Sequence, residues 1–165
     1  MSALGDRLAV TLIALESIGR RLAASLRDGG GVFPVNAETV RDDDGPRGLA
    51  RDAFLQRFQQ ATDHLLRKLF PRVQASIDGT TDFMPIRDLL EALHRASLID
   101  DPLDWLTLLE LRNRLTHDYA LSNVELAADL NAAWEIAPLI LAQVERIRAF
   151  AIAHSLLDGA SLDES

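Results

Sequence analysis

Apolar residues recur every three or four positions along almost the whole chain, and this spacing limits the possible folds more than any other feature. An α-helix makes one turn in about 3.6 residues, so residues at this spacing share one face. No segment shows the sustained alternation of apolar and polar residues that a half-buried strand requires. The sequence therefore predicts an all-α fold, an antiparallel up-and-down bundle of four to five helices.

Glycine and proline divide this pattern into segments, because glycine loses much backbone freedom in a helix and proline has no amide hydrogen to donate. Asp28-Gly29-Gly30-Gly31 ends the first segment, and Asp78-Gly79-Thr80-Thr81 forms a later turn. Residues 28–48 form a long connection rich in glycine and proline, which we expect to be mobile, with contact to a partner as the alternative. The predicted helices cover residues 3–27, 49–76, 85–97, 102–118 and a final stretch that follows Ser122.

Capping residues and prolines refine these boundaries. Pro71 should bend or break the second helix, and Pro138 should kink the last one. Pro85 suits the first position of a helix, and Asp101 suits the N-cap of the next. Ser122-Asn123-Val124-Glu125 has the spacing of a capping box, in which each end residue binds the other's backbone. The last helix should therefore begin immediately after this serine.

The size and composition favour one domain that needs no metal, disulfide or membrane. The chain has 165 residues, no cysteine, and no run of apolar residues long enough to cross a bilayer. We expect a single helical domain over residues 1–157, with 28–48 as a loop insertion and 158–165 as a flexible tail. The amino terminus does not resemble a signal peptide, so we expect a cytoplasmic protein.

The net charge of −8 restricts how this chain could meet a nucleic acid. Broad, nonspecific binding depends on many Lys and Arg side chains that neutralise phosphates. An acidic chain is poorly suited to that mode, but a small basic site remains compatible with it. If the protein acts on RNA, it should therefore do so locally.

The stretch Arg-Asn-Arg-Leu-Thr-His-Asp-Tyr, residues 112–119, carries the most chemistry, and we call it the octet. Arginine matches phosphate oxygens with its planar guanidinium, and histidine is suited to proton transfer near neutral pH. Leucines surround the octet, so it lies on a helix that packs against the core. The combination indicates phosphate-ester chemistry that needs no metal. The three other histidines, His64, His94 and His154, lack metal-ligand spacing.

The spacing inside the octet raises a geometric difficulty. Arg112 and His117 are five residues apart, which separates them by roughly 140° on an ideal helix. Asn113 and Arg114 lie four and three residues before His117 and share its face. Either the helix loosens near Thr116, or a second copy of the chain completes the site. In the other interpretation, the octet is only the polar end of a surface helix.

The octet also resembles a known signature. Arg112, His117 and Tyr119 match the R-x4-H-x-Y pattern of the HEPN superfamily, and Asn113 fits the polar residue that usually follows its arginine. The resemblance is greatest to the branch encoded beside minimal nucleotidyltransferases (MNT), which includes HEPN toxins and nucleotidyltransferase substrate-binding proteins. It covers roughly residues 50–150. Besides the octet it includes Leu55-Gln56-Arg57-Phe58 and the run from Ile86-Arg87-Asp88 to Trp105.

This resemblance implies a metal-independent endoribonuclease, without cofactor, that acts as the toxin of a pair with an MNT antitoxin. His117 would be the general acid or base for attack of a ribose 2′-OH on the neighbouring phosphate. Arg112 would stabilise the developing charge, Asn113 would orient His117 or the phosphate, and Arg114 would bind substrate. Together with the spacing difficulty, the resemblance implies a homodimer in which two octets face one another.

The same resemblance implies that the antitoxin inactivates the toxin by attaching AMP to Tyr119, the only tyrosine in the chain. A Tyr119 packed inside the core would leave no such acceptor. Two alternatives remain open. In one, the chain is a non-catalytic substrate-binding subunit of a nucleotidyltransferase. In the other, it is a helical dimerisation module without catalysis.

Overall fold

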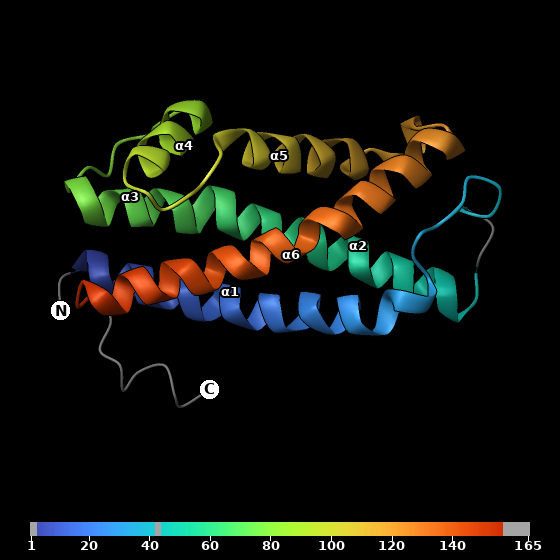
Figure 1. Ribbon diagram of the computed structural model, residues 1–165, viewed down its shortest axis with the longest axis horizontal. Helices are drawn as coiled ribbons and strands as arrows, with labels where there is room; N and C mark the ends of the chain where they lie inside the picture. Colours follow the sequence, from blue (N-terminus) through green and yellow to red (C-terminus); the bar gives the residue numbers. More distant parts are fainter. Residues whose placement is uncertain (1–2, 42–43, 157–165) are drawn as a thin grey trace.

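The computed structural model describes residues 3–41 and 44–156, and all regular structure in these ranges is helical. The all-α prediction is confirmed for this part of the chain, whereas the tail predicted at 158–165 lies outside it. Figure 1 shows long helices that run side by side in alternating directions. The helices are α1 (Ala3–Asp28), α2 (Pro46–His64), α3 (Phe70–Asp78), α4 (Ile86–Arg95), α5 (Pro102–Thr116) and α6 (Asn123–Ala153).

One continuous apolar core holds the bundle together. Helix α1 packs against α2 and α6, and α5 packs against the same two helices from the other side. Removal of these side chains from water is the main stabilising contribution. The largest fully buried side chains come from α1, from the α2–α3 region, and from α4 and α5: Leu8, Leu12, Leu15, Leu22, Phe54, Phe58, Leu65, Leu69, Phe70, Leu90, Leu93 and Trp105.

Pro71 does not break its helix. A π-helical turn over Leu65–Leu69 joins α2 to α3, and the amide of Phe70 donates to the carbonyl of Leu65. Proline cannot donate to the carbonyl four residues earlier, and its ring crowds that carbonyl. The wider π turn relieves this conflict, so α2 and α3 run on as one rod (Figure 1). The predicted break at Pro71 is therefore replaced by a local widening.

The predicted caps are present. Asp101 accepts a hydrogen bond from the amide of Leu103 at 2.8 Å. Ser122 and Glu125 form the full capping box, with the Glu125 carboxylate accepting from the Ser122 amide at 2.8 Å. Pro85 occupies the N-cap of α4 instead of its first helical position, and α6 continues through Pro138 without interruption. The sequence therefore located the helix starts to within one residue at these caps.

The described residues 29–41 of the connection between α1 and α2 contact the bundle, and the predicted mobility of residues 28–48 stays a prediction. Phe33 stacks on Trp134 of α6, with ring centroids 4.3 Å apart. The Asn131 side chain binds the amide and the carbonyl of Val35, at 2.8 and 2.9 Å. A Cβ at Gly29 would lie 2.8 Å from the Trp134 ring, so this position needs glycine. Helix α2 also begins earlier than predicted, at Pro46.

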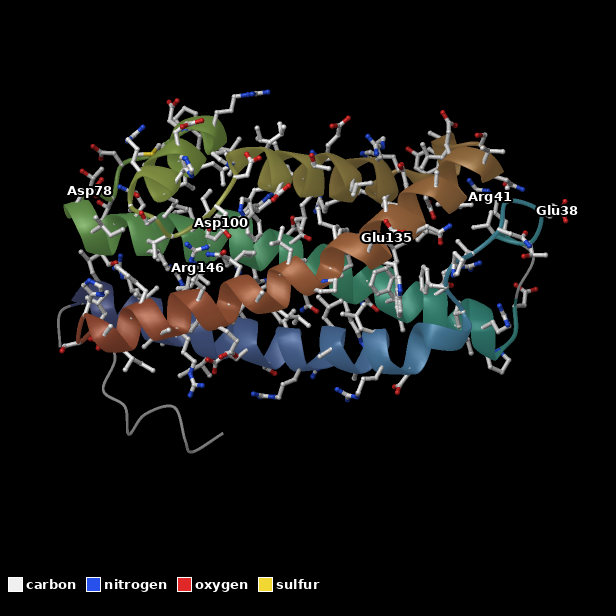
Figure 2. The ribbon with its side chains drawn as sticks, viewed as in Figure 1. Glu38, Arg41, Asp78, Asp100, Glu135 and Arg146 are labelled. Carbon is white, nitrogen blue, oxygen red and sulfur yellow. The ribbon has the colours of Figure 1, made fainter. Side chains whose placement is uncertain are left out.

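The turn before α5 is fixed to α6, and this sets the position of the octet. Arg146 donates to the Asp100 carboxylate and to the Ser97 carbonyl, both at 2.7 Å. Figure 2 shows Asp100 and Arg146 next to one another across this contact. Gln143, which is buried, donates to the carbonyl of Leu98 at 2.8 Å. Helix α5 therefore starts from a rigid attachment and carries the octet toward the opposite end of the bundle.

Candidate functional site

The octet spans the end of α5 and the turn that follows. Helix α5 ends at Thr116, His117 is its C-cap with φ −116° and ψ 44°, and Asp118–Ala120 form a 3-10 turn. The Thr116 hydroxyl donates to the carbonyl of Arg112 at 2.8 Å. The helix is therefore regular through Thr116 and ends one residue before His117, whose amide donates to the carbonyl of Arg114 at 3.0 Å. The helix ends at the point where the spacing predicts loosening, and completion of the site by a second copy stays a prediction.

Arg112 is held by a carboxylate from α2. Its Nη2 donates to Asp63 Oδ2 at 2.6 Å, and its Nη1 donates to Asn113 Oδ1 at 3.3 Å. The Arg112 side chain is 18% exposed, and its buried Nε has no hydrogen-bond partner. A charged pair that is this well shielded links α5 firmly to α2. The structure thus brings Arg112 and Asn113 together and adds Asp63 to the site.

Arg114 is held even more completely, by α6 and by its own helix. Its Nε and Nη2 make a two-point contact with the Asp129 carboxylate, each at 2.8 Å, and its Nη1 donates to Glu110 at 2.9 Å. The hydrogen bond to Asp129 is the main reason that the pKa of Arg114 is raised, and burial opposes it. Arg114, predicted to bind substrate, is therefore occupied by two carboxylates.

His117 and Tyr119 lie exposed after the helix end. The Tyr119 side chain is 78% exposed, which excludes a tyrosine packed in the core. The two rings meet edge to face with centroids 6.1 Å apart. Within residues 3–41 and 44–156, no hydrogen bond or ion pair engages either side chain. Both are therefore available to an incoming molecule.

Arg41, in the connection between α1 and α2, fixes the turn that carries these two residues. Its Nη2 donates to the carbonyls of Asp118 and Leu121, both at 2.7 Å, and its Nε donates to Asn123 Oδ1 at 2.9 Å. Figure 2 shows Arg41 beside the beginning of α6. Three hydrogen bonds from one guanidinium therefore add to the turn's own backbone hydrogen bonds, from Ala120 to His117 and from Leu121 to Asp118, both at 3.0 Å.

A hollow of about 380 Å³ opens beside this turn. One wall is the α2 face, the second is the α1–α2 connection, and the third is Asp118 with the first turns of α6. Four α2 positions at helical spacing, Asp52, Gln56, Gln59 and Asp63, form a polar stripe, and the first three line the hollow. The other lining residues are Val40, Arg41, Arg51, Leu55, Asp118, Leu126 and Leu130.

The described ranges contain no cluster of three or more His, Cys, Asp or Glu side chains that could hold a metal ion. In the same ranges, no helix has the length and hydropathy needed to cross a bilayer. Comparisons with protein-family models, with curated proteins and with solved structures find no match to this chain.

Three residues at this site were not identified from the sequence: Asp63, Asp129 and Arg41. Each contacts the octet region across a tertiary interface, 49, 15 and 77 positions away along the chain respectively. One local signal existed, because Glu110 and Arg114 are four apart on a helix and pair as that spacing predicts. Asp63 also continues the polar stripe of α2, but the stripe alone does not indicate its partner.

Proposed function

We propose that this chain is a HEPN-type, metal-independent endoribonuclease that acts as the toxin of a pair with an MNT antitoxin. The observation that carries the proposal is the exposed His117 imidazole, which lies at the end of α5 without a hydrogen-bond partner in the described part of the chain. It occupies the histidine position of the R-x4-H-x-Y pattern. An imidazole in this setting is accessible to RNA and suited to proton transfer.

In the proposed reaction, His117 removes the proton from a ribose 2′-OH, and that oxygen attacks the adjacent phosphorus. The bond from phosphorus to the 5′-oxygen then breaks, and a general acid protonates the departing oxygen. The products are a 2′,3′-cyclic phosphate and a 5′-OH. Base and acid act on opposite sides of the phosphorus, and one chain offers one His117. This requirement supports a homodimer in which the two octets supply one imidazole each.

Arg112 would stabilise the phosphorane charge in this scheme, and Asn113 would orient the phosphate or His117. Asp63 already occupies Nη2 of Arg112 at 2.6 Å. Nη1 donates to the neutral Asn113 amide over a longer distance, 3.3 Å, so we assign the phosphate to the Nη1 side, where it meets Arg112 and Asn113 together. Asp63 would then serve to hold the guanidinium in one orientation, which favours catalysis because no reorganisation is needed during the reaction.

A second candidate is the non-catalytic substrate-binding subunit of a nucleotidyltransferase. The observation that favours it is that Arg112 and Arg114 are both neutralised by carboxylates of the same chain. A cation that is already paired stabilises a phosphorane less than a free one does. In this candidate function, the chain presents a nucleotide or the exposed Tyr119 phenol to the partner's active site.

The deciding experiment incubates the purified chain with single-stranded RNA in EDTA and maps the ends of the products. Fragments with 2′,3′-cyclic phosphate and 5′-OH ends, absent with His117→Ala, would support the nuclease. Intact RNA at micromolar chain concentration would contradict the nuclease and would leave the substrate-binding subunit and the dimerisation module as the alternatives.

Tyr119 gives a separate test of the partnership. The MNT protein and ATP should add the mass of AMP to the peptide that contains Tyr119, because its phenol is exposed. Attached AMP would place negative charge and bulk beside the octet and so exclude an RNA phosphate. Tyr119→Phe is the matched control, and equal labelling of that variant would contradict the assignment.

A further inference from the structure

The hollow beside the octet has the dimensions and lining of a site for a small ligand. Its volume of about 380 Å³ falls in the range of pockets that hold small molecules. Leu55, Leu126 and Leu130 supply apolar surface, and Gln56 and Gln59 supply amides that both donate and accept. Arg41, Arg51, Asp52 and Asp118 add charged groups to the lining, so polar groups lie beside apolar surface, as a flat ring that carries hydrogen-bonding edges requires.

The hollow is continuous with the octet at two points. Asp118 lines it and is the residue directly after His117. Gln59 lines it and lies one helical turn before Asp63, the partner of Arg112. One turn of α-helix rises about 5.4 Å, so Gln59 lies close to Asp63 along α2. The hollow therefore adjoins a neighbour of Arg112 and a neighbour of His117.

The Asp118 carboxylate is the polar group that sets the chemistry of a ligand here. Within the described ranges, no hydrogen bond or ion pair engages this carboxylate, whereas the backbone carbonyl of Asp118 accepts from Arg41 and from the amide of Leu121. An ionised carboxylate accepts hydrogen bonds through two adjacent oxygens and donates none. It therefore pairs best with a ring edge that presents two neighbouring N–H donors. Among the four RNA bases, guanine alone has such an edge, formed by its N1–H and N2–H groups.

We propose that this hollow is a base-binding subsite that selects guanine next to the phosphate held at the octet. The inference rests on the proposed nuclease function and names the nucleotide that the enzyme would recognise. The Asp118 carboxylate receives N1–H and N2–H, a Gln56 or Gln59 amide donates to O6, and the leucines contact the faces of the ring. Recognition of an unstacked base through its Watson–Crick edge is the usual mode in single-stranded RNA.

The test measures binding of the four ribonucleoside 5′-monophosphates to the full wild-type chain in EDTA, by calorimetry or by NMR titration. GMP should bind at least about tenfold tighter than AMP, CMP or UMP, the discrimination expected of a two-point base contact. Asp118→Asn replaces two acceptors by one acceptor and one donor, which match adenine and cytosine. The preference should therefore move from GMP to AMP and CMP. Asp82→Asn, an exposed change between α3 and α4, removes the same charge and should leave the GMP preference intact.

Equal binding of all four nucleotides, no binding of any, or an unchanged preference in Asp118→Asn would overturn the subsite. Binding is measured without cleavage, so the two proposals fail separately. A chain that prefers GMP but leaves RNA intact would overturn the nuclease and keep the subsite. A chain that cleaves RNA without preference for guanine would overturn the subsite and keep the nuclease.

Discussion

The two halves of the octet are used differently by the fold. In the N-terminal half, Arg112–Leu115, both arginines are paired with carboxylates of α2 and α6, and Leu115 is in the core. In the C-terminal half, Thr116–Tyr119, the helix ends at Thr116, and the imidazole and phenol that follow are exposed. The first half ties α5 to its neighbours, and the second half is left for contact with other molecules.

This difference shows that residue type alone does not identify a reactive group. Arginine, asparagine and histidine all suit phosphate chemistry, yet only the histidine is without a polar partner within the described ranges. The paired arginines hold the helix end in place, and the exposed residues rely on that support. The following predictions test whether the two halves can be separated in this way.

The largest effect is expected for His117→Ala in the RNA cleavage assay. Loss of a general acid or base typically lowers the rate ~10²–10⁴-fold, whereas an exposed side chain contributes little to stability. Single-turnover cleavage and a thermal melt measure the two quantities. His154→Ala is the matched control, because His154 is the C-cap of α6 as His117 is of α5. Similar cleavage by both variants would show that His117 is not the reactive group.

The next effect concerns stability in the N-terminal half. Asp129→Asn leaves the partly buried Arg114 without its main partner and should lower the free energy of unfolding by roughly 1–3 kcal/mol. Glu110→Gln acts on the same arginine, but the Glu110 side chain is 71% exposed, against 13% for Asp129. Glu110→Gln should therefore lower the free energy of unfolding by less than about 0.5 kcal/mol. Urea unfolding of both variants gives the comparison, and equal losses would mean that burial does not distinguish the two pairs.

The sequence was sufficient for the features that depend on local spacing. The helices, the Asp101 cap and the Ser122–Glu125 capping box follow from residues within a few positions of one another, and all are observed. The same local reasoning placed the octet at the end of a helix. It also raised the alternative that the helix loosens at Thr116, because a five-residue spacing fits one helix face poorly.

The sequence was insufficient where a contact depends on how the helices meet. Asp63 and Asp129 look like ordinary helix-surface acids, and their pairing with Arg112 and Arg114 requires the packing of α5 on α2 and α6. The α1–α2 connection looked mobile because glycine and proline dominate its composition. Phe33 of this connection stacks on Trp134, and Arg41 binds the turn before α6, and only the folded bundle provides these contacts.

A smaller effect is expected for Arg41, which contacts the turn in the C-terminal half of the octet. Arg41→Ala removes three hydrogen bonds to the turn after His117 and should lower stability by about 1 kcal/mol, since these bonds are exposed to solvent. Amide hydrogen exchange should report faster opening at Ala120 and Leu121, with little change in α1. Arg41→Lys is the matched control, because lysine keeps the charge but lacks the planar fork that reaches three acceptors. Full protection in both variants would show that the turn is ordered without Arg41.

The smallest effect is the pH dependence of the cap that begins α6 just after the octet. Hydrogen bonds from the Ser122 backbone and hydroxyl lower the pKa of Glu125 below its ordinary value of 4.5. The carboxylate is ionised in the folded and unfolded states above pH 4.5, so its stabilising contribution is complete there. This contribution is lost as the pH falls through the lower, folded-state pKa.

Exchange of the Ser122 amide should therefore accelerate, relative to its intrinsic rate, between pH 5 and about pH 3, the range in which carboxylates titrate. Glu125→Gln keeps a cap acceptor that does not titrate, so the change with pH should disappear, whereas Glu91→Gln on the exposed face of α4 should preserve it. Persistence of the pH dependence in Glu125→Gln would assign it to another carboxylate, and the turn that carries His117 and Tyr119 would then not depend on this cap.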